Sequence, residues 1–570
     1  MKNLPTILIL AIIILLPFVL RKKETTVGQS DDTLVIITPH DEGIRHEFET
    51  AFSKKYETET GRSVDIDWRV IGGTSEIVRF VQSTYTHNFR HHWEHDLKRS
   101  WNPNVQNSFM NRKLNLANPP TDNPEGVEAK TAFTLSNVTC GIDVFFGGGS
   151  YDFIQQARAG TLVPFTTEEK LLELFPPEEV PVKFSGEPFY DPSSVWAGAV
   201  LSQFGIIYNE VSLQRLGIEA TPASWHDLTD PRYIGEIALA DPTQSGSMTK
   251  AFEMIVQQQM LEDVREAGLD TNSPEAMPIV AEAWMTAMQR IQLISANARY
   301  FTDSSKKPSI DVSAGECAAG MSIDFYGRFQ AETVEMRTGS KRFSYVTPAG
   351  GSTVSVDPIG LFRGAPNEEI AVKFIEFVLS REGQKLWNWK PGTPEGTEKY
   401  ALRRSPMHRS LYAEEFDSYR SDAGHNPYDE AGMFVYHPAW TSRLFSPLRF
   451  IIKVAFIDPH KELTSAWDAI QQAKTEGRRE AATRAQLVLT NLDILDYASA
   501  SGRISDILNQ RTKISEVKLA RELTVHFKQR YQLAQKIAEG RKSLISIQRE
   551  HLKNTPQSKK ASPAIDLPIK

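Results

Sequence analysis

The sequence predicts an α/β protein with two lobes, followed by a mainly helical C-terminal extension. Three short apolar segments, 34–37, 64–70 and 142–146, are each followed by a loop and by apolar residues at helical spacing. This repeated strand, loop and helix order is typical of a parallel, doubly wound sheet. At 570 residues the chain exceeds one ordinary domain of roughly 100 to 200 residues. From about Lys461 the pattern is almost continuously helical, which indicates an extension beyond the lobes.

The composition is that of a globular protein, and the charge of residues 1–500 argues against nucleic-acid binding by this part of the chain. Apolar residues make up 40% and charged residues 24% of the chain, as in globular proteins. The net charge is −7, but residues 501–570 carry 15 Lys or Arg against 6 Asp or Glu, which leaves −16 for the remainder. An acidic body argues against a nucleic-acid partner.

An uncharged apolar segment, 4–20, lies between Lys2 and the basic residues 21–23. It is typical of an export signal or a membrane anchor. Because no small-residue cleavage motif precedes Arg21, we expect an uncleaved anchor rather than a cleaved signal peptide. The basic residues after the segment would by themselves favour a cytoplasmic body.

The first lobe is expected to contain three strands, each ending in a loop with polar or glycine residues. The strands are 34–37, which leads to His40, 64–70, which leads to Gly72-Gly73-Thr74-Ser75, and 142–146, which leads to Gly147–Ser150. The segment 85–129 is rich in His, Asn, Arg and Pro and has no strand pattern, so we expect an insertion on the surface.

The second lobe is expected after a first crossing at 196–209. Strand 237–240 leads into loop 241–247, and strand 318–323 leads into Asp324-Phe325-Tyr326. The chain then returns over 344–356. Segment 354–387 predicts a strand and an amphipathic helix with Asn367 as its cap. Asp357-Pro358 is expected to break that strand, as a crossing between lobes or as an ordinary turn.

These patterns divide the chain into regions whose boundaries are predictions. They are residues 1–30 as signal or anchor, 31–204 with 348–400 as lobe 1 including the insertion 85–129, 205–347 as lobe 2, 401–552 as the helical extension, and 553–570 as a disordered tail.

Several motifs together resemble the extracellular solute-binding proteins of bacterial ABC importers, of the iron-type branch. They are segments 141–149 (GIDVFFGGG), 222–228 (PASWHDL), 240–247 (ADPTQSGS) and 354–387. The resemblance implies the two-lobed periplasmic-binding-protein type II (Venus-flytrap) fold, in which the lobes close over a ligand. It further implies no catalysis, a periplasmic or other extracytoplasmic location, and an ABC permease as partner. The uncleaved segment 4–20 is expected to tether the chain to the inner membrane.

The expected ligand site lies where loops follow strands and helix N-termini present free N–H groups. Glycine allows the backbone to approach a ligand, and the hydroxyl groups come from both lobes, a set that suits an anion or a cation with an accompanying anion. The candidates for ligand binding are His40, Thr74, Ser75, Gly148, Gly149, Ser245, Ser247, Asp324 and Tyr326.

No cofactor is expected, but the resemblance to iron-binding members makes ferric iron or another metal one possible cargo. It assigns His40 and Tyr326 as metal ligands, with Asp324 standing where a second tyrosine is expected. An oxyanion or phosphorylated compound and a cationic or other small organic solute stay open as alternatives.

Two other functions are considered. His87, His91 and His95 recur every fourth residue and would share a helix face, so a zinc-dependent hydrolase is a distant alternative; a solvated surface helix fits better, because the chain contains no catalytic motif. A membrane-anchored ligand sensor is the second alternative. Cys140 and Cys317 are expected to be buried free thiols in opposite lobes.

Overall fold

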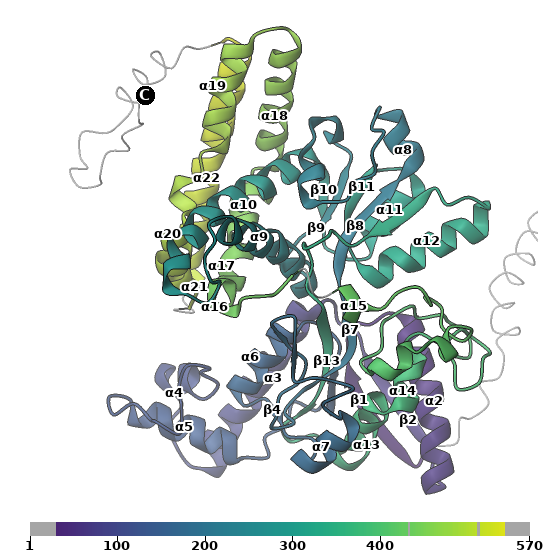
Figure 1. The fold of residues 1–570 in the computed structure, drawn as a ribbon. Coiled ribbons are helices and arrows are strands. Elements are labelled where there is room, and N and C mark those ends of the chain that lie inside the picture. Colours follow the sequence, from purple (N-terminus) through teal and green to yellow (C-terminus); the bar gives the residue numbers. More distant parts are fainter. Residues whose placement is uncertain (1–29, 431–433, 510–512, 542–570) are drawn as a thin grey trace, which may run out of the picture.

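The computed structural model describes residues 30–430, 434–509 and 513–541. Two α/β lobes lie one above the other in Figure 1, and a set of helices from the C-terminal part of the chain packs beside the upper one. The predicted two-lobed α/β fold with a mainly helical extension is thereby confirmed.

Lobe 1 is built on a mixed six-stranded sheet of order β2-β1-β3-β13-β4, with β7 paired to β13. Strands β1, β2 and β3 are parallel, and β13 runs antiparallel to β3, β4 and β7. The strands are β1 (Asp32–Ile37), β2 (Val64–Arg69), β3 (Val144–Phe146), β4 (Leu162–Val163), β7 (Ala197–Ser202) and β13 (Ser355–Phe362). The helices are α2 (Glu42–Thr60), α3 (Thr74–His91), α6 (Ser150–Ala159), α7 (Glu168–Leu174), α13 (Glu368–Leu379) and α14 (Arg381–Leu386), and β5 (Lys183–Phe184) with β6 (Glu187–Pro188) forms a small hairpin.

Lobe 2 is built on a five-stranded sheet of order β10-β9-β11-β8-β12. Its strands are β8 (Phe204–Asn209), β9 (Ile237–Ala240), β10 (Ala298–Thr302), β11 (Ala319–Ile323) and β12 (Phe343–Val346). Its helices are α8 (Glu210–Arg215), η2 (Trp225–Thr229), η3 (Pro231–Tyr233), α9 (Gly246–Glu266), η4 (Pro274–Ala276), α10 (Met277–Asn297), α11 (Lys307–Ala314) and α12 (Asp324–Thr338). Helices α9 and α10 are buried on several sides because lobe 2 covers one side and the extension another.

The chain crosses between the lobes twice. The first crossing is at Gln203, between β7 and β8, and the second spans residues 347–354, between β12 and β13. The prediction that Asp357-Pro358 breaks the strand is wrong: β13 continues through the pair with a shift in register against β7, since a bulge accommodates a proline that cannot donate to the ladder. Asn367 does precede α13, but its amide donates to Asp143 Oδ2 instead of capping the helix.

The segment between α3 and β3 contains short helices joined by loops. Helix α3 continues to His91 and passes into η1 (His92–Asp96), and the next helices are α4 (Pro103–Ser108) and α5 (Pro124–Leu135). Phe89 of α3 stacks on Phe109 with ring centres 4.7 Å apart, and Phe133 of α5 packs edge-on against both. Aromatic packing therefore joins this segment to the core of lobe 1.

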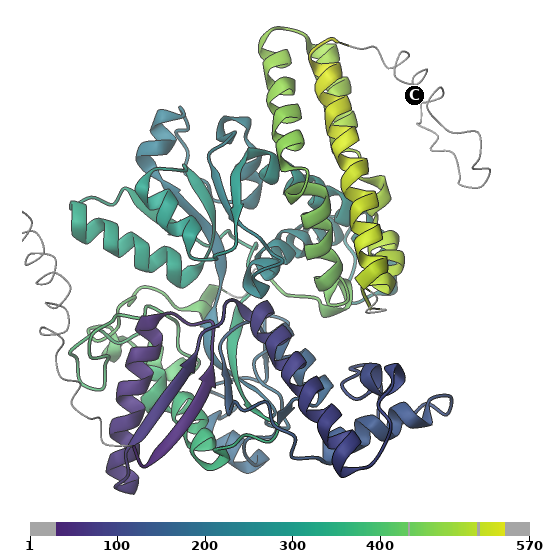
Figure 2. The same ribbon diagram turned by 180° about the vertical axis from the view of Figure 1, so that it is seen from behind.

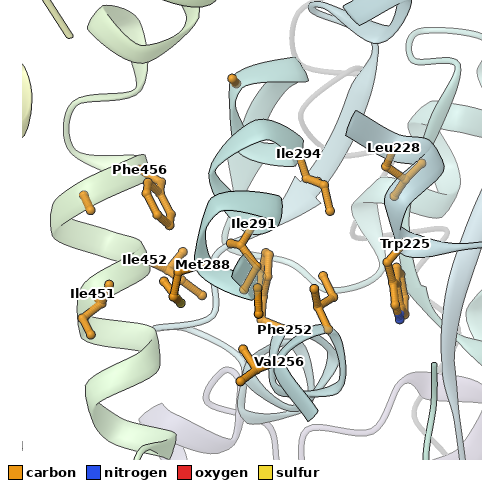
Figure 3. Packing of buried hydrophobic residues seen from close by; sticks show 14 of the residues in the cluster. Trp225, Leu228, Phe252, Val256, Met288, Ile291, Ile294, Ile451, Ile452 and Phe456 are labelled. Atoms are coloured by element: carbon orange, nitrogen blue, oxygen red, sulfur yellow. The ribbon is translucent and has the colours of Figure 1, made fainter. Parts of the chain in front are cut away.

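The C-terminal extension shares one hydrophobic core with lobe 2. Ile452 and Phe456 face Met288 and Ile291 of α10 (Figure 3). Trp284 of α10 donates its indole N–H to the carbonyl of Leu495 at 2.8 Å. The extension contains η5 (Arg409–Tyr412), η6 (Glu414–Phe416), α15 (Pro427–Glu430), α16 (Pro438–Thr441), α17 (Phe445–Ile452), η7 (Lys453–Ile457), α18 (His460–Thr475), α19 (Arg479–Thr490), η8 (Asp493–Leu495), α20 (Tyr497–Ser499), η9 (Ala500–Ile504), α21 (Ser505–Asn509) and α22 (Lys513–Ala538).

Helices α18, α19 and α22 project beyond lobe 2, as seen from both sides in Figures 1 and 2.

Cys140 and Cys317 are both buried and free, which confirms the prediction of two separate thiols. Among the residues that the structure describes, none of the helices is long and apolar enough to span a membrane. The predicted membrane segment, residues 4–20, lies outside the described residues.

Candidate functional site

A cavity of about 610 Å³ lies where the two lobes meet. Lobe 1 contributes Gly148 and Gly149 from the loop before α6, and lobe 2 contributes Gly246, Ser247 and Lys250 from the start of α9. Both loops follow a strand at its carboxyl end and precede a helix. The first N–H groups of such a helix have no acceptor inside the helix, so a ligand in this cavity meets free donors from both lobes.

The glycine loop of lobe 1 allows only glycine at two positions. Gly147 has φ +93°, and a Cβ there would lie 2.4 Å from Nε2 of His40. Gly148 has φ +124°, and its Cβ would lie 2.8 Å from Cγ2 of Thr74. A side chain at either position would combine an unfavourable backbone conformation with a clash. The loop is therefore shaped by its packing against His40 and Thr74.

The two lobes touch beside the cavity. The Gln244 carbonyl oxygen would lie 2.6 Å from a Cβ placed on Gly73, and the Asp152 Oδ2 atom would lie 2.7 Å from a Cβ placed on Gly246. Asp152 is a buried residue of α6, and burial raises the pKa of its carboxyl group. Its negative charge faces the positive end of α9 from the opposite lobe, a favourable position for a carboxylate.

A buried charged cluster forms the floor of the cavity. Lys250 Nζ lies 2.5 Å from Glu187 of lobe 1 and 2.9 Å from Glu253 of its own helix. It also lies 3.4 Å from the ring centre of Tyr436, whose hydroxyl donates to Glu253 at 2.9 Å. Burial alone would lower the pKa of Lys250, but the two carboxylates outweigh it and raise that pKa. Lys250 therefore stays charged and links lobe 1, lobe 2 and the extension.

His40 lies behind the glycine loop in a second buried polar group. Its Nε2 atom is 3.7 Å from Asp357 Oδ2 and 3.4 Å from Arg404 Nη1, and burial lowers the pKa of its imidazole. Arg404 donates to Asp357 at 2.7 Å and covers the ring of Phe325 at 4.1 Å. Burial would raise the pKa of Asp357, but Arg404 and His40 more than compensate and lower it.

The predicted metal ligands lie in different surroundings. Tyr326 packs on Phe325 with ring centres 4.1 Å apart, and burial raises the pKa of its phenol, which disfavours phenolate. Asp324 accepts a hydrogen bond from Ser202 at 3.4 Å and lies 3.6 Å from Arg328. No group of three or more His, Cys, Asp or Glu side chains that could hold a metal occurs in the described part of the chain.

The nine predicted ligand-binding residues fall into three sets. Gly148, Gly149 and Ser247 line the cavity. Three support those loops: Thr74 contacts Gly148, Ser75 accepts a hydrogen bond from Arg449 at 3.5 Å, and Ser245 caps α9 by accepting from Met248 N at 3.3 Å. His40, Asp324 and Tyr326 are not among the lining residues.

Several lining residues were missed from the sequence. Lys250 and Glu253 lie three residues apart on the helix after the loop 241–247, a spacing that could have signalled a shared face. Other missed residues come from distant segments and carry no local signal; among them are Glu187, Tyr436, Arg443 and Phe445.

The histidine segment lies in lobe 1, on α3 and η1. The rings of His91 and His95 are 4.5 Å apart, and His92 pairs with Asp96 at 2.7 Å. In each of these pairs the two residues are four positions apart. They lie at the end of α3 and in η1, before α4.

Residues 164–403 match the model of a family described as bacterial extracellular solute-binding protein, which confirms the resemblance predicted from the motifs. This is a family of binding proteins rather than enzymes. An uncharacterised protein of Haemophilus influenzae is 29% identical over 252 residues, or 44% of this chain. The chain spans 61% of the length of that relative.

Two solved structures illustrate the chains that follow a similar path. The periplasmic binding protein AfuA from Actinobacillus pleuropneumoniae, with fructose-6-phosphate bound, is 17% identical, with 75% of this chain and 99% of that chain covered and a TM-score of 0.45. Iron-bound HitA from Pseudomonas aeruginosa is 16% identical, with 73% and 98% covered and a TM-score of 0.41.

Proposed function

We propose that this chain is an extracytoplasmic solute-binding protein that captures an anionic solute between its lobes and delivers it to the permease of an ABC importer. The observation that carries the proposal is the cavity at the lobe junction, whose lining comes from both lobes. A ligand that contacts both lobes stabilises the closed arrangement of the lobes over the open one. Lobe closure then distinguishes the ligand-bound protein from the free protein.

The charges around the cavity favour an anion. Glu187 and Glu253 pair with Lys250, and Asp357 pairs with Arg404. Once these pairs are set aside, the described lining keeps one carboxylate, Asp506, and four cations. Arg112 lies near the buried carboxylate of Asp152, whereas Lys113, Arg158 and Arg443 form no ion pair within the described ranges. The starts of α6 and α9 add two helix N-termini, which favour negative charge. The start of α9 also faces the carboxylate of Asp152.

Delivery to a permease and tethering of the chain through residues 4–20 complete the proposal. Both follow from the family match and from the apolar N-terminal segment. Ferric iron remains an alternative cargo, held with an accompanying anion.

Thermal unfolding of the purified full-length chain tests capture. We would add, separately, phosphate esters, ferric iron, spermidine and thiamine. A ligand at about a hundred times its Kd stabilises the folded chain by roughly 2.7 kcal/mol. Ser247→Asp places a negative charge at the start of α9 and should abolish the shift with an anion, while Ser340→Asp, at an exposed position of lobe 2, should retain it.

A shift with spermidine or thiamine alone would contradict an anionic cargo. A shift that survives Ser247→Asp would show that the anion binds elsewhere.

A further inference from the structure

We infer that the C-terminal extension forms a third wall of the ligand cavity, and that this wall fits the cavity to an organic anion with an apolar body. The inference rests on the proposed function, because it concerns the ligand of the same site. Tyr436, Arg443 and Phe445 of the extension line the cavity together with residues of both lobes.

The wall is held firmly on lobe 2. Gln257 of α9 donates to the carbonyl of His437 at 2.9 Å and to the Thr441 hydroxyl at 2.7 Å. His437 N donates back to Gln257 Oε1 at 3.1 Å. Leu444 and Leu448 belong to the core shared with lobe 2. A shift of the wall would leave the buried Gln257 and Thr441 side chains without these partners, so the bonds hold the wall against α9.

The same wall also contacts lobe 1. Phe445 stacks on Tyr151 of α6 with ring centres 4.2 Å apart and an angle of 24° between the rings. The Tyr151 and Ser446 hydroxyls lie 3.3 Å apart, and Tyr436 N donates to the carbonyl of Ser185 at 2.8 Å. The aromatic rings that meet here line the cavity and give it an apolar side next to the helix N-termini.

Size and charge then define the ligand class. The cavity of about 610 Å³ is many times larger than the space that one water molecule needs. A single metal ion or an inorganic oxyanion would leave most of this volume to water, whereas the volume lies within the range of cavities that enclose organic ligands. Arg443 is exposed and has no ion-pair partner in the part of the chain that the structure describes. It is available to the charged group of a ligand.

The test compares binding of phenyl phosphate, glucose 6-phosphate and inorganic phosphate to the full-length chain by thermal shift and calorimetry. Arg443→Ala and Phe445→Leu alter the wall. Their matched controls are Arg484→Ala and Leu487→Ala, at exposed positions of α19 in the same extension. We expect an organic phosphate to bind at least tenfold more tightly than inorganic phosphate. Arg443→Ala should weaken it by about tenfold, Phe445→Leu should weaken phenyl phosphate selectively, and the controls should bind as the unaltered chain does.

Each contrary outcome has a distinct meaning. Equal binding of an organic phosphate by both wall variants and both controls overturns the inference and leaves anion capture intact. Preference for inorganic phosphate overturns the inferred ligand class. Binding of spermidine or thiamine without any anion contradicts the proposed anionic cargo, and the absence of a shift with every compound of both panels contradicts solute capture itself.

Discussion

Replacing Lys250 with methionine should destabilise the chain more than any single surface change. The change keeps an unbranched side chain one atom shorter than lysine. It leaves Glu187 and Glu253, 2% and 1% exposed, without their shared cation at 2.5 and 2.9 Å. Removing one partner of a buried ion pair typically costs about 3–5 kcal/mol. Urea unfolding at pH 7.5 without added ligand, followed by tryptophan fluorescence, measures the loss.

The loss should shrink at lower pH. Burial already raises the pKa of Glu187, and removal of the lysine should raise it further. A carboxyl group whose pKa is higher in the folded than in the unfolded chain destabilises the fold as the pH rises, and protonation relieves that cost. The difference between Lys250→Met and the unaltered chain should therefore be smaller at pH 5 than at pH 7.5.

The control is Arg484→Met, which removes one side of an exposed pair with Glu480 and should change the free energy of unfolding by less than about 1 kcal/mol. A Lys250→Met chain as stable as this control, or equally destabilised at both pH values, would refute the reasoning.

Three further predictions concern the frame of the site. Gly147→Ala should lower stability by about 1–3 kcal/mol more than Gly217→Ala in thermal unfolding, since both have positive φ but only Gly147 faces the His40 ring; equal losses would contradict the predicted clash. Asp143→Ala should lower the free energy of unfolding in urea by about 2–5 kcal/mol, because the backbone N–H groups of Val35 and Asn367 lose their acceptor. A loss below about 1 kcal/mol would argue against Asp143 as a structural acceptor. Burial lowers the pKa of His40, His408 and His460. Because the unfolded chain then binds more protons than the folded chain, the free energy of unfolding should fall as the pH drops below about 6.5, by at most about 1.4 kcal/mol per histidine for each pH unit. A free energy of unfolding that stays constant from pH 7.5 to 5.5 would contradict this prediction.

The fold was largely predictable because its signals are local. The strand 237–240, its loop and the helix behind it follow from an apolar run, polar turn residues and helical spacing, and the structure has β9 at those residues. The behaviour of Asp357-Pro358 was not predictable, because whether a proline breaks a strand depends on the neighbouring strand, here β7, and on the bulge that it allows.

The candidate site was predictable only where backbone conformation defines it. Gly148, Gly149 and Ser247 were found because glycine loops and helix starts are visible in sequence. Glu187, Lys250 and Tyr436 meet through tertiary packing over 249 residues of chain, from 187 to 436. The contribution of the extension to the cavity could not be predicted for the same reason. A helical sequence pattern indicates an apolar face but not the part of the protein against which that face packs.

The structure of the full-length chain bound to the organic phosphate that stabilises it most strongly tests the central claim directly. We expect the phosphate group between the starts of α6 and α9, near Gly149 and Ser247, with Arg443 and Phe445 in contact with the ligand. A ligand held by one lobe alone, or on the outer surface of the chain, would contradict capture between the lobes.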